Sequence, residues 1–347
     1  MRYHSQMHSF VEKTSAEQGF GASWRQEVVP VLAHHEARQR RRIMLASLIT
    51  GIAAGVGGVI LLQQAQIVSL GLLVTPLNQI LVLVLAGLVV IMTWMALLPI
   101  SGAVAGPVRR AVELHFANLL TPTDNAGFAE VILQDLVTDS VLADQNYTRT
   151  AAYAGTYDDC RIWMIEAVTG QRTIHDHHSA DLLVFRVSLP FPLPGETRAD
   201  SHTDRLLSMA AGQNGIAGYQ ADHDEFNDIF TIATTDTGAA AQLFTSGFAE
   251  TLLRVQEHLA SPLMRRSGVQ PRLAMQATRG NLVIVVDRRA NGAPGILATD
   301  AEQVARSLIV QFATLPALVD CLQGPAGTSP VFVAPASRQA PRNVMSV

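Results

Sequence analysis

A histidine-rich run between two predicted strands has the most specific ligand chemistry in this sequence. It contains His175, His177 and His178, and Asp181 follows closely. Imidazole and carboxylate groups are common ligands of zinc and other divalent ions. The run therefore suggests a metal site with these four residues as ligands. The alternative is a solvated loop, because adjacent His177 and His178 cannot easily bind one ion from a single strand.

Further histidine and acidic residues lie in later loops. His202 with Asp204, and His223 with Asp224, would complete a metal site if the loops converged. An acidic cluster overlaps the second pair and consists of Asp222, Asp224, Glu225 and Asp228. Its spacing lacks the turn glycine and closing glutamate of an EF-hand loop. We interpret this cluster as a solvated acidic turn before a strand.

The candidate nucleophiles lack activating neighbours. Ser246 has no G-x-S-x-G context and is typical of a helix cap. Cys160 follows Asp158 and Asp159, whose negative charge disfavours a reactive thiolate. Neither residue predicts catalysis, so an enzyme is the less favoured class.

The basic residues exclude several functions. Lys13 is the only lysine, so the later chain has neither a Schiff-base lysine nor the phosphate-binding lysine of a P-loop. The net charge is −4, and the later arginine pairs have no interleaved aromatic residues, which argues against nucleic acid as a partner. Cys160 and Cys321 form no C-x-x-C motif. No cofactor is therefore expected, apart from a divalent cation such as zinc at the histidine run.

A long uncharged stretch organises the chain. No charged residue occurs between Arg42 and Arg109, and two apolar runs, Ile43–Leu62 and Ile80–Leu98, lie within it. Each has about the length of roughly 20 residues that a membrane-spanning helix needs. Backbone groups in hydrocarbon must be paired internally, so the runs predict a two-helix transmembrane hairpin over residues 43–100.

The flanking arginines predict the orientation of this hairpin. Arginines cluster over Arg38–Arg42, Arg109 and Arg110 follow the second run, and the joint between the runs has no basic residue. Positive charge stays on the cytoplasmic side, so both termini are expected there. The Arg38–Arg42 cluster would contact anionic lipid. Gly51 and Gly55 form a G-x-x-x-G motif that would support self-association.

Residues 1–42 form a predicted cytosolic arm with a helical apolar stripe. Trp24, Val28, Val31 and Leu32 recur at helical spacing. Such a helix would either lie on the membrane surface or pack on the protein's own soluble domain. The sequence does not decide between these two.

The chain after the uncharged stretch predicts an α+β domain over residues 101–323, followed by a disordered tail over 324–347. Helices are expected near residues 107–137, with Pro107 in a first turn and a second helix at Gly127–Val137. The period then changes to two, and the later expected elements are strands Ala151–Tyr157, Arg161–Val168, Asp181–Leu189 and Asp228–Thr235, helix Ser246–Leu259, a hairpin of Arg272–Thr278 and Asn281–Asp287, and a last helix capped by Thr299 or Asp300. Short turns dominate the connections, so the sheet should be mostly antiparallel with flanking helices.

The same order of elements resembles a bacterial family. The residues that carry the resemblance are Gly155–Tyr157, Leu182–Leu189, the acidic D-x-x-F-x-x-x-F-like segment Asp224–Phe230, Phe248–Leu253 and the L-x-I-x-V-like strand Leu282–Val286. They are similar to the family catalogued as domain of unknown function 3137, over roughly Phe10 to Leu322. The resemblance implies an inner-membrane protein with a cytoplasmic α+β domain and transfers no chemistry. Family members are often charged where this chain has its histidine run.

Together these features favour a non-catalytic, membrane-tethered binding or scaffold module at the bacterial inner membrane. Its expected partners are the lipid bilayer and a membrane or cytosolic protein that the sequence does not identify. The competing hypothesis is a membrane-associated, metal-dependent hydrolase that uses the histidine run.

Overall fold

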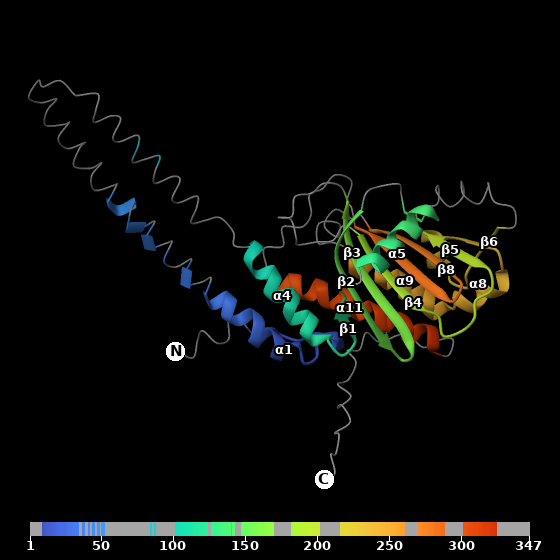
Figure 1. The fold of residues 1–347 in the computed structure, drawn as a ribbon, viewed down its shortest axis with the longest axis horizontal. Helices are drawn as coiled ribbons and strands as arrows, with labels where there is room; N and C mark the ends of the chain where they lie inside the picture. The colour runs from blue at the N-terminus through green and yellow to red at the C-terminus, as the bar shows by residue number, and fades with distance from the viewer. Residues whose placement is uncertain are drawn as a thin grey trace, which may run out of the picture.

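The computed structural model describes residues 9–34, 101–123, 126–139, 141–142, 147–169, 182–201, 216–260, 270–288 and 301–324, with scattered positions between 37 and 52 and at 84 and 87. Over these residues the fold is α+β, with one antiparallel sheet of nine strands and flanking helices (Figure 1). The expected fold class of the domain is therefore confirmed. The proposed transmembrane hairpin lies almost entirely outside the described residues.

The elements follow one another from an N-terminal helical segment to a long C-terminal helix. In chain order they are η1 (Ser15–Glu17), α1 (Phe20–Ser23), η2 (Trp24–Val28), α4 (Ser101–His115), β1 (Leu120–Pro122), α5 (Ala126–Thr138), β2 (Tyr147–Tyr157), β3 (Cys160–Thr169), β4 (Leu182–Ser188), β5 (Glu196–Asp200), β6 (Ala217–Tyr219), α7 (Asp224–Ile229), β7 (Thr231–Thr234), α8 (Thr237–Leu243), α9 (Ser246–Leu259), β8 (Arg272–Thr278), β9 (Asn281–Asp287) and α11 (Ala301–Gln323).

Hairpins and short turns build the sheet. Its strand order is β1-β2-β3-β4-β9-β8-β5-β7-β6, and every neighbouring pair is antiparallel. The β2–β3 turn has Asp158 and Asp159 at φ 49° and 65°, and the β8–β9 turn has Arg279 and Gly280 at φ 47° and 73°. Two successive left-handed residues match the twist of an antiparallel hairpin. The predicted helix Ser246–Leu259 and the predicted β8–β9 hairpin are confirmed with their bounds.

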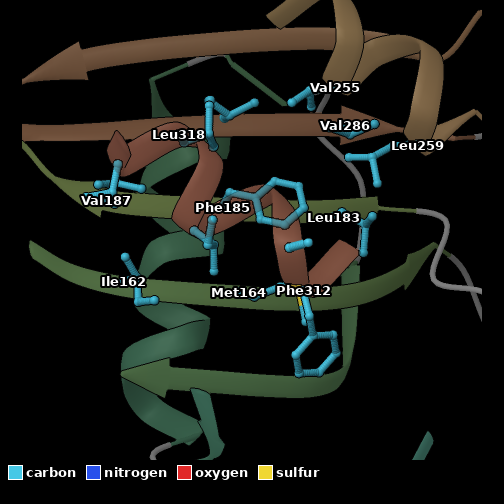
Figure 2. Close-up of a cluster of buried hydrophobic side chains, with 14 of the residues drawn as sticks. Ile162, Met164, Leu183, Phe185, Val187, Val255, Leu259, Val286, Phe312 and Leu318 are labelled. Atoms are coloured by element: carbon cyan, nitrogen blue, oxygen red, sulfur yellow. The ribbon is translucent and has the colours of Figure 1, made fainter. Parts of the chain in front are cut away.

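Successive side chains of a strand point to opposite faces of the sheet. An apolar cluster lies on each face. On β4, Leu183, Phe185 and Val187 join the larger apolar cluster, where Figure 2 shows them near Phe312 and Leu318 of α11. The even-numbered residues of β4 face the opposite side, where α5 covers the sheet. The larger cluster also contains residues of α4, α9 and the N-terminal segment.

Among the described residues, one helix is long and apolar enough to cross a bilayer. This helix is α11, with a mean hydropathy of 1.4 in its most apolar window, of which 72% is buried inside the protein. A buried core helix meets the same length and composition criteria as a membrane span. The packing of Phe312 and Leu318 in the main cluster accounts for the apolar sequence of α11.

The predicted strand Asp228–Thr235 was wrong at its start. Residues Asp224–Ile229 form helix α7, and the strand begins only at Thr231. The His223 ring nitrogen Nδ1 accepts a hydrogen bond from the Phe226 backbone N–H at 3.2 Å, and Asp224 lies in the first helical turn. A cap and an acidic first turn both stabilise a helix N-terminus, which explains the acidic cluster.

The first helix of the domain also begins earlier than predicted. Helix α4 starts at Ser101, so Pro107 lies inside it instead of in its first turn. Proline removes one helical hydrogen bond. Val108, Ala111 and Val112, which follow the proline, are all buried in the main cluster.

Short strands at the edges of the sheet were not predicted. Strand β1 pairs with β2 through Leu120 and Gly155, and a Cβ on Gly155 would lie 1.8 Å from the carbonyl oxygen of Leu119. Glycine is therefore required for this close approach. Strands β5 and β6 and helix α8 were missed as well, since each is short and has a weak apolar period.

Candidate functional site

The predicted metal ligands fall in a part of the chain that the structure does not describe. These residues are His175, His177, His178 and Asp181, and the accessory pair His202 and Asp204 lies outside the described residues too. Within the described ranges, no group of three or more His, Cys, Asp or Glu side chains is arranged to hold a metal ion. The metal site therefore stays a prediction.

The two candidate nucleophiles have structural positions. Ser246 is the first residue of α9, and the capping residue is its neighbour Thr245, whose hydroxyl accepts from the Phe248 N–H at 3.3 Å. Cys160 is buried at the start of β3, where the Gln323 side-chain amide lies 3.4 Å from its sulfur. Burial raises the pKa of the Cys321 thiol, and this disfavours a reactive thiolate at that position.

The most distinctive site of the described chain is the junction where both flanks of the uncharged stretch meet the domain. Residues 20–28 precede this stretch and α4 follows it, and Figure 1 draws the two side by side. Phe20, Trp24 and Val28 are 0%, 3% and 0% exposed and belong to the same core cluster as Val108 and Val112 of α4. Of the two alternatives for the arm, the structure therefore shows packing on the protein's own domain.

Arg306 of α11 ties the start of the arm to the C-terminal helix. Its guanidinium donates to the carboxylates of Glu17 and Glu302 and to the Val11 carbonyl, the last at 2.7 Å. It also lies 4.6 Å from the centre of the Phe10 ring. Because Glu17 is buried and caps the backbone N–H groups of Lys13 and Thr14, this one carboxylate fixes both the arm and α11.

His115, the last residue of α4, provides another contact to the arm. Its Nε2 lies 3.1 Å from the Ala16 carbonyl oxygen, and its ring makes edge contacts with Phe20 and Phe116. Burial lowers the pKa of this imidazole, while the Ala16 carbonyl and Glu12 oppose the shift. Burial of the ring therefore favours its neutral form.

This shift predicts a loss of stability in acid. Since the native pKa of His115 is lowered, the unfolded chain takes up a proton more readily as the pH falls below about 6.5. Stability should be highest above that pH and decline below it. In urea titrations of the full chain in detergent, His115→Gln should show a smaller decline between pH 7 and pH 5.5. The matched control is His258→Gln on the exposed end of α9. An unchanged decline in His115→Gln would contradict the assignment.

A polar network lies within the otherwise apolar contact between α4 and the sheet. It consists of Arg109 and Glu113 on α4, Tyr153 on β2 and Glu166 on β3, and we call it the α4 network. Arg109 donates to the Tyr153 hydroxyl at 3.0 Å and to the Glu166 carboxylate at 2.6 Å. Tyr153 in turn donates to Glu113 at 2.7 Å. The Glu166 side chain is only 2% exposed.

The electrostatics of the network keep Arg109 charged and Tyr153 protonated. Burial opposes the charge of Arg109, yet Glu166 and Tyr153 hold the pKa of the guanidinium above its usual value. Burial raises the pKa of the Tyr153 phenol, against the effect of Arg109. The phenol therefore stays protonated and remains the donor to Glu113. The network positions α4 on the sheet.

Two local features set Glu166 apart. Strand β2 has an irregular register between Arg149 and Ala151, directly opposite Glu166, and the Thr150 hydroxyl donates to the Glu166 carbonyl at 3.2 Å. Such bulges redirect side chains. The carboxylate oxygen Oε1 is buried and has no hydrogen-bond partner among the described residues. Among the described residues, the hydrogen bond to this carboxylate comes from Arg109, which donates to its other oxygen, Oε2.

A second polar network has a purely structural arrangement. At the end of α5, the Asp139 carbonyl accepts from Arg198 at 2.8 Å, and its carboxylate accepts from Gln276 at 3.0 Å. Arg272 pairs with Asp200 on the neighbouring strand. These contacts tie α5 to β5 and β8.

Comparison with known proteins identifies no relative. No family model matches the chain, no curated protein matches it, and no solved structure matches it. The geometry of the junction must therefore carry the functional argument.

Proposed function

We propose that this chain is a membrane-tethered binding or scaffold module, anchored in the bacterial inner membrane by a two-helix hairpin over residues 43–100. Both termini and the α+β domain lie in the cytoplasm in this proposal. The biochemical role is to hold a cytosolic or membrane protein partner at the bilayer.

The main observation that supports the membrane tether is an exposed apolar helical surface within residues 43–100. The described positions among residues 43–100 are helical, and their large apolar side chains are more than half exposed: Met44 74%, Leu45 54%, Leu48 62%, Ile52 57% and Val84 56%. Over the rest of the described chain, the large apolar residues with comparable exposure are Val11, Leu114 and Val131. A concentration of exposed apolar surface indicates contact with lipid or with another protein.

The junction supports a tether of two helices. Residues 20–28 and α4 share one core, so the segments before and after residues 43–100 lie next to each other in the domain. A hairpin of two spans that starts and ends on one side of the bilayer is compatible with this arrangement. Arg38–Arg42 and Arg109–Arg110 lie on that same side, as the distribution of positive charge in membrane proteins requires. The first cluster would then contact anionic lipid, and Gly51 with Gly55 would support pairing of spans.

Extraction of membranes with alkaline carbonate tests the tether. The full chain should remain in the membrane pellet. Substitution of Leu48 and Ile52 by Asp should release a large part of it, since each charge in a span costs about 2.5–3.5 kcal/mol of insertion free energy. Val131→Asp is the matched control, because Val131 is 55% exposed but lies on α5. Complete release of the unsubstituted chain would contradict the proposal.

The binding role and the competing metal-dependent hydrolase differ in what purifies with the chain. A binding module should retain a stoichiometric protein partner after chemical cross-linking in intact membranes. A hydrolase built on His175, His177, His178 and Asp181 should contain a divalent metal that a chelator removes, together with the activity. Elemental analysis before and after chelation separates the two.

A further inference from the structure

Two opposite charges on α4 converge on one hydroxyl. Arg109 and Glu113 are four residues apart and therefore lie on the same side of the helix. Arg109 donates to the Tyr153 oxygen at 3.0 Å, and the Tyr153 hydroxyl donates to Glu113 at 2.7 Å. Arg109 also donates to Glu166, which lies on the next strand. The positive and then the negative charge along α4 therefore each have a partner on the sheet: Arg109 contacts Glu166 and Tyr153, and Glu113 contacts Tyr153.

On the side of the arm, α4 has two further polar contacts, from His115 to the Ala16 carbonyl and from Arg110 to Glu27. Its apolar contacts are less specific for its axial position. Val108, Ala111 and Val112 are fully buried against the core. Contacts between small apolar side chains are non-directional, so a shifted helix can still bury much of the same area. Hydrogen-bonded ion pairs are directional, and the selection of one register is their best-supported structural use.

The sequence of α4 penalises both neighbouring registers. A displacement of four residues moves a helix by about 6 Å along its axis. In one direction this displacement places Glu113 at the position of Arg109, so that its carboxylate faces the carboxylate of Glu166. In the other direction Ala105 occupies that position and the charge of Glu166 is buried without its partner. Both arrangements are strongly unfavourable in a desolvated site.

We propose that the α4 network is a register device that holds α4 at one axial position on β2 and β3 and opposes displacement by one turn. Its members are positioning residues. Because α4 directly follows the proposed hairpin over residues 43–100, the device controls how a movement of the hairpin reaches the sheet. This last step rests on the proposed membrane tether, whereas the register selection itself does not.

The decisive experiment exchanges the two charges on α4. In the variant Arg109→Glu/Glu113→Arg, the arginine can pair with Glu166 only if α4 moves by about one turn. Spin labels on Leu114 and on either Arg161 or Thr148 report this movement in the full chain, after alanine replaces both native cysteines. All three label positions are exposed, and Arg161 and Thr148 lie at opposite ends of the β2–β3 hairpin. Pulsed electron resonance distances should change by roughly 5 Å in at least one pair.

Two further variants make the outcome unambiguous. Arg109→Glu/Glu166→Arg reverses the ion pair in place and should restore the parental distances, which a general loss of packing would not do. Arg109→Met/Glu166→Leu removes the buried ion pair. Its distance distribution should then contain a second component from a displaced α4. This variant tests the proposal even if the exchange variant fails to fold. Parental distances in the exchange variant, or one unchanged distance in the apolar variant, would overturn the proposal. Measurement in detergent keeps this result independent of the tether, which carbonate extraction tests separately.

Discussion

Arg109→Met alone should lower the free energy of unfolding by about 3–5 kcal/mol, because removal of one partner leaves a buried charge uncompensated. Glu166 is 2% exposed in its side chain and has one oxygen without a partner among the described residues. Urea titration of the full chain in detergent, followed by near-ultraviolet circular dichroism, measures this loss.

The double variant and an exposed pair serve as controls. Arg109→Met/Glu166→Leu should recover most of the loss, because a buried ion pair and an apolar pair of similar volume differ little in stability. Arg254→Met removes a pair with Glu250 on α9 whose side chains are 36% and 38% exposed, and should cost about 0.5 kcal/mol or less. Equal losses in the single and double variants of the buried pair would contradict this description of Glu166.

Phe20→Ala should destabilise the domain by about 3–5 kcal/mol, the range for truncation of a buried aromatic side chain. Phe20 is 0% exposed and contacts the rings of Phe10, Trp24 and His115. The loss is expected although Phe20 precedes the rest of the domain by some 80 residues of sequence, since the arm is part of the core. The same urea titration in detergent checks it.

The control for the arm is Val11→Ala. Val11 is 58% exposed, so its truncation should change stability by no more than about 0.5 kcal/mol. If Phe20→Ala changed the free energy of unfolding as little as Val11→Ala, the arm would not be part of the folded core. The proposed junction between the arm and α4 would then be wrong.

The elements that sequence reasoning predicted well are those with a strong local signal. The β2–β3 and β8–β9 hairpins carry left-handed turns, β4 is an almost continuous apolar run, and α9 has an apolar side together with the Thr245 cap. Each of these signals lies within the element itself.

The missed features depend on contacts between distant parts of the chain. β1 exists because Gly155 allows a close backbone approach, and β5 because Arg198 and Asp200 are paired by α5 and β8. α7 was missed because its acidic residues were interpreted as a solvated turn and its last two, Asp228 and Ile229, were placed in the following strand. The capping role of His223 was not recognised. Arg109 was noted only as a flanking positive charge, since its pairing with Glu166 bridges 57 residues.

The central claim is that one cytoplasmic domain holds both ends of a membrane hairpin. The most direct measurement is the activity of alkaline phosphatase, which requires the periplasm, fused after Leu70 or after Gly170 in bacterial cells. Leu70 lies in the joint between the two apolar runs, and Gly170 follows β3 in the domain. We expect high activity after Leu70 and none after Gly170. Activity after Gly170, or none after Leu70 in a stably expressed fusion, would contradict the claim.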